Sequence, residues 1–553
     1  MKKLISILFL FSFLFTYPSL AQLRVAEIFT DHMVLQREKP VPVWGWSEKN
    51  EKVTVSFQGR HYSTKTGRNG KWNTELPPMN AGGPYELSIQ SNSGNIILSN
   101  VMIGDVWLCS GQSNMAWTVD RFDNAAEVSA SATDVDIRHF KVPPTWAKHP
   151  ADRLDSSSWV VNTPETNGQF SAVAYHFARE LRKEVDVSIG LLNASWGGSR
   201  IEPWMSTESL QPYLVEDIQQ LLLRREQERK DALKNTEAMV ARLSAKPKGQ
   251  EIHQFDFDDS SWESMEVPGH WENSGYPGMD GLVLFRKIFT LSASEAEEGI
   301  TVHLGKIDDS DWTYVNGQLV GSLKDQWNAT RSYRVGPEIL REGKNVVVVR
   351  VEDTGGGGGI YGDPEQIYLE SATGKTTLAG NWKFLIEKVS KLSGPGYSPN
   401  NAPVVIYNKM IHPILNFPIK GIIWYQGESN ATHDDALRYR ELFATMINDW
   451  RAGWNLGNVP FLWVQLANYM APDEEPANSD WAVLRESQST ALHLPNTAQA
   501  VIIDIGEADD IHPKNKHDVG YRLSLAARKL AYGADLVHSG PVYQSMTKDG
   551  SSI

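Results

Sequence analysis

One serine stands in a turn that directly follows an apolar run. The segment GDVWLCSGQSNMAWTV, residues 104–119, places Ser113 between Gln112 and Asn114. Far along the chain, the segment GEADDIHPKNK places His512 in a loop after another apolar run. Acyl transfer requires a hydroxyl nucleophile, an imidazole that takes its proton, and hydrogen-bond donors for the developing oxyanion. The two segments predict the first two of these groups, with Ser113 as nucleophile and His512 as general base.

Other polar groups that suit this chemistry follow other apolar runs. The segment ASWGGSRIEPW contains the pair Gly197–Gly198, and the segment QGESNA begins with Gln426. We expect the oxyanion donors to be the N–H of Ser113, an N–H of the glycine pair, and the side-chain amide of Gln426 or Asn114. Asp509 stands three residues before His512, from where its carboxylate could hold the imidazole in one tautomer.

A parallel sheet would bring these distant segments together. From residue 101 onward, apolar runs alternate with helical patterns, which is typical of a parallel sheet with helices on both faces. Such sheets bind ligands outside the carboxyl ends of their strands, and each candidate group follows a predicted strand. Each residue alone also fits an ordinary structural role, such as a serine that caps a helix or a histidine on the surface. Their expected meeting at one sheet edge favours a functional site.

The remaining chain predicts several further parts. Residues 1–21 have a basic start, an apolar run and Ser-Leu-Ala at the end, as in a secretory signal peptide, and predict export to the periplasm or outside the cell. Alternating residues predict a small N-terminal β-sandwich over residues 22–100 and an inserted β-sandwich over residues 251–388. The α/β domain then comprises residues 101–205 and 389–535, with a helical connector over 206–250, and residues 536–553 begin an incomplete C-terminal β segment.

Composition excludes several function classes. The net charge of -14 disfavours nucleic acid as a partner, and after residue 21 no apolar run is long enough to span a membrane. Cys109 is the single cysteine, so an intramolecular disulfide is impossible, and we expect it to be a buried small residue. Metal-ligand spacings and phosphate-binding glycine loops are missing, and Met115 stands where a GxSxG elbow needs glycine. We therefore expect neither a metal nor a cofactor, and the sequence gives no indication of the oligomeric state.

Four ordered motifs resemble the sialate O-acetylesterase family of SGNH (GDSL-like) hydrolases. They are GQSNM, ASWGGSRIEPW, KGIIWYQGESNA and DIHPKNK, and DHMVLQREKPVPVWGW is similar to the family's β-rich N-terminal region. The resemblance implies a flavodoxin-like α/β hydrolase that deacetylates O-acetylated sialic acid or sialylated glycans without a cofactor. It implies Ser113 as nucleophile and His512 as base, with Gly198, favoured over Gly197, and Gln426 in the oxyanion hole.

The resemblance leaves several assignments open. Asp509 is the favoured partner of His512, with Asp510 or a backbone carbonyl as alternatives. Arg200, beside the glycine pair, would pair with a sialate carboxylate or serve a structural role. The inserted region resembles the galactose-binding-like jelly rolls that accompany family-two glycoside hydrolases. The competing functions are an acetylxylan or other glycan O-acetylesterase, and a carbohydrate-binding protein without catalytic activity.

Overall fold

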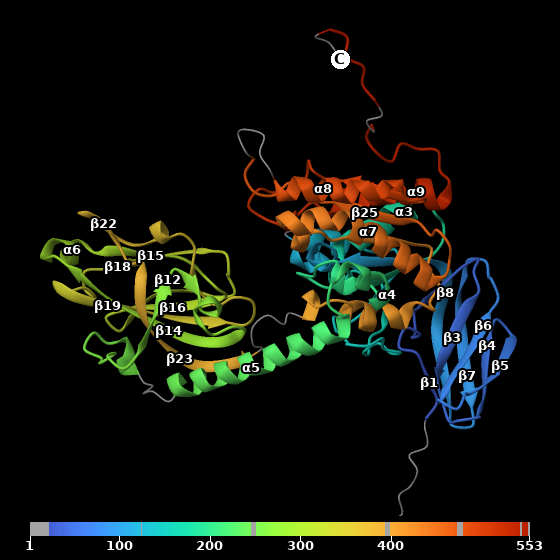
Figure 1. The fold of residues 1–553 in the computed structure, drawn as a ribbon, viewed down its shortest axis with the longest axis horizontal. Helices are drawn as coiled ribbons and strands as arrows, with labels where there is room; N and C mark the ends of the chain where they lie inside the picture. Colours follow the sequence, from blue (N-terminus) through green and yellow to red (C-terminus); the bar gives the residue numbers. More distant parts are fainter. Residues whose placement is uncertain are drawn as a thin grey trace, which may run out of the picture. The chain divides into compact units, whose positions relative to one another are not determined.

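The computed structural model describes residues 22–122, 124–244, 250–392, 399–472, 479–541 and 545–550. The predicted signal peptide lies outside these residues, so export of the chain stays a prediction. The chain separates into two compact units, Met1–Ile218 with Pro399–Ile553 and Gln219–Ser398 (Figure 1). Within the described residues, no helix combines the length and the apolar character that crossing a membrane requires.

An all-strand region begins the first unit. One sheet has the strand order β1-β3-β6, and in the other β4 pairs with β5 and β7 while β8 pairs with β7 and β2. Buried and less buried side chains alternate along β3 and β4, as expected for strands with one face in a core. The strands are β1 (Arg24–Val25), β2 (Val34–Gln36), β3 (Val41–Trp46), β4 (Lys52–Phe57), β5 (Arg60–Lys65), β6 (Lys71–Leu76), β7 (Gly82–Ser91) and β8 (Gly94–Gly111).

Strand β8 belongs to two regions at once. Its first part pairs antiparallel with β7, for example Ile96 with Ile89. Its last part pairs in parallel with strands on both sides, where Trp107 lies opposite Leu191 and Gly421. The predicted domain boundary between residues 100 and 101 therefore lies inside one continuous strand. The strand that leads to Ser113 is held by partners along its whole length.

The α/β sheet of the first unit has the strand order β10-β9-β11-β8-β24-β25-β26. It is a mixed sheet, because β10 runs antiparallel to β9 while all the other neighbours are parallel. The carboxyl ends of β8, β11, β24 and β26 consequently meet at one edge. The further strands are β9 (Ile137–Lys141), β10 (Trp159–Val161), β11 (Ile189–Ser195), β24 (Gly421–Tyr425), β25 (Phe461–Gln465) and β26 (Thr497–Val501).

Helices cover both faces of this sheet (Figure 1). Adjacent residues of a strand point to opposite faces, and Trp424 packs on Trp450 of α7 (His433–Trp454) with ring centroids 5.5 Å apart. Its neighbour Tyr425 faces α9 (Lys516–Tyr532), whose Lys516 Nζ lies 5.6 Å from the tyrosine ring. α3 (Ala172–Arg182) packs against α9, and α8 (Asp480–Thr490) against α7. The shorter helices are α1 (Ser113–Ala116), α2 (Ala125–Ala130) and α4 (Thr207–Leu210).

The second unit consists of α5 (Ile218–Ser244), α6 (Ala293–Glu298) and two antiparallel sheets around an apolar core. One sheet has the order β12-β23-β14-β19-β16-β17, and the other has the order β13-β20-β15-β21-β22 with β18 beside β15. The strands are β12 (Glu263–Val267), β13 (Gly269–His270), β14 (Met279–Leu291), β15 (Ile300–Ile307), β16 (Ser310–Val315), β17 (Gln318–Leu323), β18 (Thr330–Val335), β19 (Gly343–Asp353), β20 (Gly359–Tyr361), β21 (Ile367–Ser371), β22 (Gly374–Thr377) and β23 (Gly380–Leu392). β23 continues past residue 388, where the inserted region was predicted to end.

The C-terminal residues differ from the sequence prediction. The described residues between 536 and 550 contain none of the named strands, whereas the sequence predicted the start of a β segment there.

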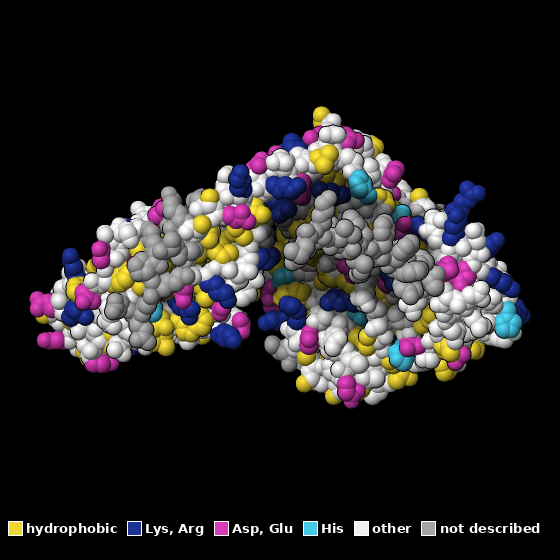
Figure 2. All heavy atoms as spheres, turned by 90° about the horizontal axis from the view of Figure 1, so that it is seen from below, with side chains coloured by type: hydrophobic (Ala, Val, Ile, Leu, Met, Phe, Trp, Pro, Cys, Tyr) yellow, Lys and Arg dark blue, Asp and Glu magenta, His cyan; other side chains and the backbone are white. Residues whose placement is uncertain are grey.

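Figure 2 shows basic and acidic side chains interspersed over the face that it draws, without a large patch of one sign.

Candidate active site

Ser113 begins α1 two residues after β8 ends. The preceding Gly111 has φ +136°, and a Cβ added to it would lie 2.0 Å from the Tyr425 carbonyl oxygen. Glycine is therefore required where the chain turns away from β24. Ser113 Oγ lies 2.9 Å from His512 Nε2, although the two residues are 399 positions apart. This distance lies in the range over which a general base takes the proton of a nucleophile.

The His512 ring is held from two sides. The Trp117 indole stacks on it, with ring centroids 3.9 Å apart and an angle of 17° between the planes. Asp510 Oδ1 accepts the His512 backbone N–H at 2.8 Å and lies 3.5 Å from Nδ1. The predicted Asp509 is exposed, and the acidic partner of the ring is Asp510 instead. The reason is local, because an aspartate readily accepts a backbone N–H two residues ahead, and this brings its carboxylate to the ring.

Burial and a neighbouring cation keep the imidazole uncharged. Burial, followed by the charge of Lys516, lowers the pKa of His512 to about 4, although Asp510 opposes the shift. At neutral pH the ring is therefore neutral, and it needs one proton on one nitrogen only. With that proton on Nδ1, facing Asp510, Nε2 is free to accept the Ser113 hydroxyl.

The Asn114 side chain joins the serine segment to two other loops. Its Nδ2 donates to Glu428 Oε1 at 2.5 Å and to the Ile511 carbonyl at 3.0 Å. Its Oδ1 accepts from Lys516 Nζ at 2.5 Å. Both amide hydrogens are thus committed, so Asn114 positions Ser113 and His512 and does not serve as the oxyanion donor that the sequence allowed.

Lys516 is the residue that sequence reasoning missed. It is only 2% exposed, and burial lowers its pKa to about 7. Glu428, also buried, has a pKa raised by burial, and the two groups share Asn114 as a hydrogen-bond partner. The DIHPKNK motif contains this lysine, but a lysine at the start of a helix is ordinarily exposed, so its burial could not be read from the sequence.

Gln426 occupies a different role from the one predicted. The residue is fully buried, and its Nε2 donates to the Ser199 carbonyl at 3.0 Å and to Asn430 Oδ1 at 2.8 Å. Its Oε1 accepts the Tyr439 hydroxyl at 2.9 Å. Because both amide hydrogens bind protein oxygens, Gln426 is not available to an oxyanion. It connects the turn after β24 to the glycine-pair segment and to α7.

The glycine pair lies beside Ser113. A Cβ added to Gly197 would lie 3.5 Å from Ser113 Cβ, whereas one added to Gly198 would meet only Asn400 Nδ2, at 3.4 Å. The contact with Ser113 is therefore made by Gly197, and the favoured Gly198 stays a prediction as donor. Within the described part of the chain, the N–H groups of Ser113 and of both glycines have no hydrogen-bond acceptor. These three groups remain candidates for the oxyanion hole.

Arg200 is already paired within the protein. Its Nη2 lies 2.5 Å from Asp435 Oδ2 and 3.4 Å from Glu202 Oε1. Its backbone N–H donates to Asn401 Oδ1 at 3.1 Å. Of the two predicted roles, these ion pairs favour the structural one, and contact with a substrate carboxylate stays a prediction.

Potential metal ligands are dispersed among the described residues, and the single cysteine is buried. Among the described residues, no three His, Cys, Asp or Glu side chains gather as metal ligands would. Cys109 is fully buried in β8, as expected, and burial raises the pKa of its thiol well above the ordinary value. This cysteine therefore packs as a small apolar residue.

The chain is similar to known carbohydrate esterases. The model of the family "carbohydrate esterase, sialic acid-specific acetylesterase" matches residues 103–235 and 397–529, which contain every candidate site residue above. Sialate O-acetylesterases of Mus musculus and Homo sapiens are 26% and 25% identical, over 94% of this chain and 75% and 73% of theirs. A crystal structure of a carbohydrate acetylesterase from Xanthomonas citri is 32% identical with a TM-score of 0.60, over 96% of this chain and 79% of that one.

The structural role of Gln426 predicts a loss of stability on substitution. Gln426→Met removes three hydrogen bonds and leaves buried partners unsatisfied, each at a cost of about 1–3 kcal/mol. We expect the thermal transition of the first unit to move to lower temperature in scanning calorimetry. Gln90→Met, at an exposed strand position, is the matched control and should leave the transition in place. An unchanged transition in Gln426→Met would contradict the structural role.

Proposed function

The chain belongs to the sialic acid-specific acetylesterase family of carbohydrate esterases, and on this premise we propose that it hydrolyses O-acetyl esters of sialic acids. The observation that carries the proposal is the 2.9 Å distance between Ser113 Oγ and His512 Nε2. The neutral state of the imidazole supports its role as general base, and the stacked Trp117 supports its orientation. The reaction class is carboxylic ester hydrolysis through an acyl-enzyme.

The proposed reaction has two stages. In the first, Ser113 Oγ attacks the acetyl carbonyl carbon while His512 Nε2 takes the hydroxyl proton, and that proton then passes to the sugar oxygen as its bond to the acetyl group breaks. In the second, His512 takes a proton from water, the resulting hydroxide attacks acetyl-Ser113, and acetate leaves as Ser113 regains its proton. The N–H groups of Ser113 and of the glycine pair stabilise the oxyanion in both stages.

The residues around the pair act as positioning groups. Asp510 holds the Nδ1 proton of His512, so that Nε2 faces Ser113. Lys516 fixes Asn114, which in turn binds the Ile511 carbonyl beside His512. The positive charge of Lys516 also disfavours a second proton on His512, and this keeps the base active in mildly acidic solution.

A cavity lined by residues of the segment that follows Ser113 is the proposed pocket for the sugar, and neither Ser113 nor His512 is among its lining residues. A cavity of about 460 Å³ lies beside the segment that leaves α1 and includes Thr118 and Asp120. Lys141, at the carboxyl end of β9, and Gln169 line it as well. This volume is in the usual range for small-molecule sites, about 300–1,000 Å³. The lining also contains His139, but burial lowers the pKa of this imidazole to about 3, so Lys141 is the lining residue that is positively charged at neutral pH. We therefore propose Lys141, in place of Arg200, as the partner of the sialate carboxylate.

The finer architecture and the location of the chain belong to the same proposal. We propose that the α/β region is a flavodoxin-like SGNH hydrolase domain, which is supported by the parallel neighbours of β8 and by helices on both sheet faces. The two antiparallel sheets of the second unit support a galactose-binding-like jelly roll. The composition of residues 1–21 supports export to the periplasm or the cell exterior.

Removal of the nucleophile tests the mechanism. In Ser113→Ala we expect acetate release from 9-O-acetylated sialic acid to fall by about 10⁴-fold or more, because no acyl-enzyme can form. Ser110→Ala is the matched control, since this buried hydroxyl three residues earlier has no hydrogen-bond partner among the described residues. Turnover near the parent value in Ser113→Ala would end the proposal.

The charge of Lys516 predicts a shift in the pH profile. The base must be neutral, so kcat/KM should rise with pH through the low pKa of His512, near pH 4. In Lys516→Met the cation is lost and the pKa of His512 rises toward the ordinary value of about 6.5. The acid limb, measured with 4-nitrophenyl acetate, should therefore move to higher pH. The exposed Lys514→Met is the control, and an acid limb at the same pH in Lys516→Met would refute the electrostatic role.

The proposed contact of Lys141 predicts substrate discrimination. Loss of a charge-assisted hydrogen bond costs about 1.5–3 kcal/mol, so Lys141→Ala should raise KM for an O-acetylated sialic acid by about 10-fold or more. The KM for acetylated xylan, which lacks this carboxylate, should stay within about twofold of the parent value. Equal effects on both substrates would show that Lys141 does not recognise the carboxylate.

A further inference from the structure

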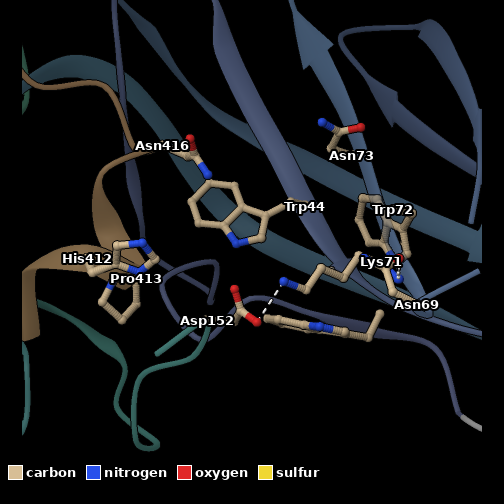
Figure 3. A pocket seen from close by; sticks show the side chains of 11 residues that line it. Trp44, Asn69, Lys71, Trp72, Asn73, Asp152, His412, Pro413 and Asn416 are labelled. Atoms are coloured by element: carbon tan, nitrogen blue, oxygen red, sulfur yellow. Dashed lines mark hydrogen bonds and ion pairs between the residues drawn. The ribbon is translucent and has the colours of Figure 1, made fainter. Parts of the chain in front are cut away.

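A second cavity, of about 320 Å³, lies in the first unit and includes none of the candidate active-site residues in its lining. Its wall contains three tryptophans and three asparagines, namely Trp44, Trp46, Trp72, Asn69, Asn73 and Asn416 (Figure 3). We call it the tryptophan pocket. Residues from the N-terminal strands and from the segment before β24 meet here, so the pocket depends on the packing of both regions.

The register of β3 and β6 builds the aromatic wall. Trp44 lies opposite Asn73 and Trp46 lies opposite Lys71, so these four side chains share one face of the sheet. Trp44 and Trp46 are only half-buried, although large aromatic residues of a core are ordinarily covered. Figure 3 shows the Trp44 ring in the middle of the pocket, with the Asn416 side chain directed toward it.

Polar groups of the pocket have unused hydrogen-bonding capacity. The side chains of Asn73 and Asn416 are exposed, and among the described residues neither amide has a hydrogen-bond partner within the protein. These amides can therefore exchange solvent water for the hydroxyl groups of a ligand.

The charges of the pocket cancel. Lys71 Nζ lies 2.6 Å from Asp152 Oδ2, and Figure 3 shows this ion pair at the rim. The one further titratable group of the lining, His412, is tied through Nδ1 to the Ala151 carbonyl at 2.8 Å. Arg153, which lies over the Trp46 ring, is paired with Glu27. No excess charge is left to attract an ionic ligand, so the chemistry of the lining favours an uncharged polar molecule.

A pyranose ring matches this lining. It has an apolar C–H face that packs on an indole, and hydroxyl groups that both donate to and accept from amides. We propose that the tryptophan pocket binds an uncharged pyranose residue of a glycan, as a site separate from the one that hydrolyses the ester. Trp44 supplies the main stacking surface, and Trp46 supplies a second one although the Arg153 guanidinium lies over one face of its ring, 5.1 Å from the centroid. The asparagine amides select the hydroxyl groups. Such a site would keep a glycan chain on the enzyme between hydrolytic events.

Affinity electrophoresis of the full chain tests the proposal. The gels contain soluble unacetylated xylan, galactomannan or mixed-linkage β-glucan, and one gel contains the sialylated glycoprotein fetuin. We expect at least one neutral polysaccharide to retard the protein, with an affinity about 10-fold weaker in Trp44→Ala and in Trp46→Ala. Trp327→Ala, at a 58% exposed tryptophan of the second unit, is the matched control and should migrate as the parent does.

Two further variants separate this site from hydrolysis and from misfolding. Ser113→Ala should retain full retardation, so a failure of the esterase proposal and a failure of this one give different results. Trp44→Phe, which keeps an aromatic face, should bind more strongly than Trp44→Ala, and a thermal transition equal to that of the parent excludes unfolding as the cause of any loss. The proposal is overturned if no neutral polysaccharide retards the protein, if the tryptophan variants bind as the parent does, or if only fetuin binds.

Discussion

The Asn114 amide is the interaction on which the site depends. It accepts from Lys516 at the start of α9 and donates to Glu428 after β24 and to the Ile511 carbonyl. One side chain next to the nucleophile therefore fixes the loops of three different strands. Gln426 provides a second connection of this kind, between the turn after β24 and the glycine pair. The reactive pair is thus positioned by buried amides whose hydrogen-bonding groups are fully used.

This arrangement also sets the electrostatics of the site. A buried lysine and a buried glutamate stand on either side of Asn114, and each is shifted toward its neutral form by burial. The lysine charge lies close enough to lower the pKa of His512, whereas Asp510 raises it. Asp510 therefore orients the imidazole of His512, and the charge of Lys516 disfavours its protonation. Burial of a polar network is costly unless it is satisfied, and this network is satisfied around Asn114.

The sequence predicted the parts that depend on periodicity and strand order. Ser113 and His512 follow apolar runs, and parallel strands bring such loops to one edge, so their proximity could be anticipated. Asp510 and Asp509 differ by one position in a loop, and only the backbone turn decides which carboxylate meets the ring. From the sequence, the Gln426 amide could equally donate to an oxyanion or connect buried segments of the chain. Its hydrogen bonds to three protein groups show that it connects buried segments. Arg200 forms an ion pair with Asp435, which is 235 positions away, so the residues near Arg200 in the sequence do not reveal this partner.

The order of strands in the sheet has a consequence for how the protein matures. β8 is flanked by β11 on one side and by β24 on the other, and the entire second unit lies between these two in the chain. A nascent chain that emerges from its N-terminus would hold the nucleophile strand with one neighbour missing until the second unit has been made. At about 5–20 residues per second, the 399 positions between Ser113 and His512 correspond to about 20–80 s of synthesis. The hydrolytic pair therefore cannot form before His512 has been synthesised, and a ribosome-bound fragment that ends before this residue has no means of cleaving esters.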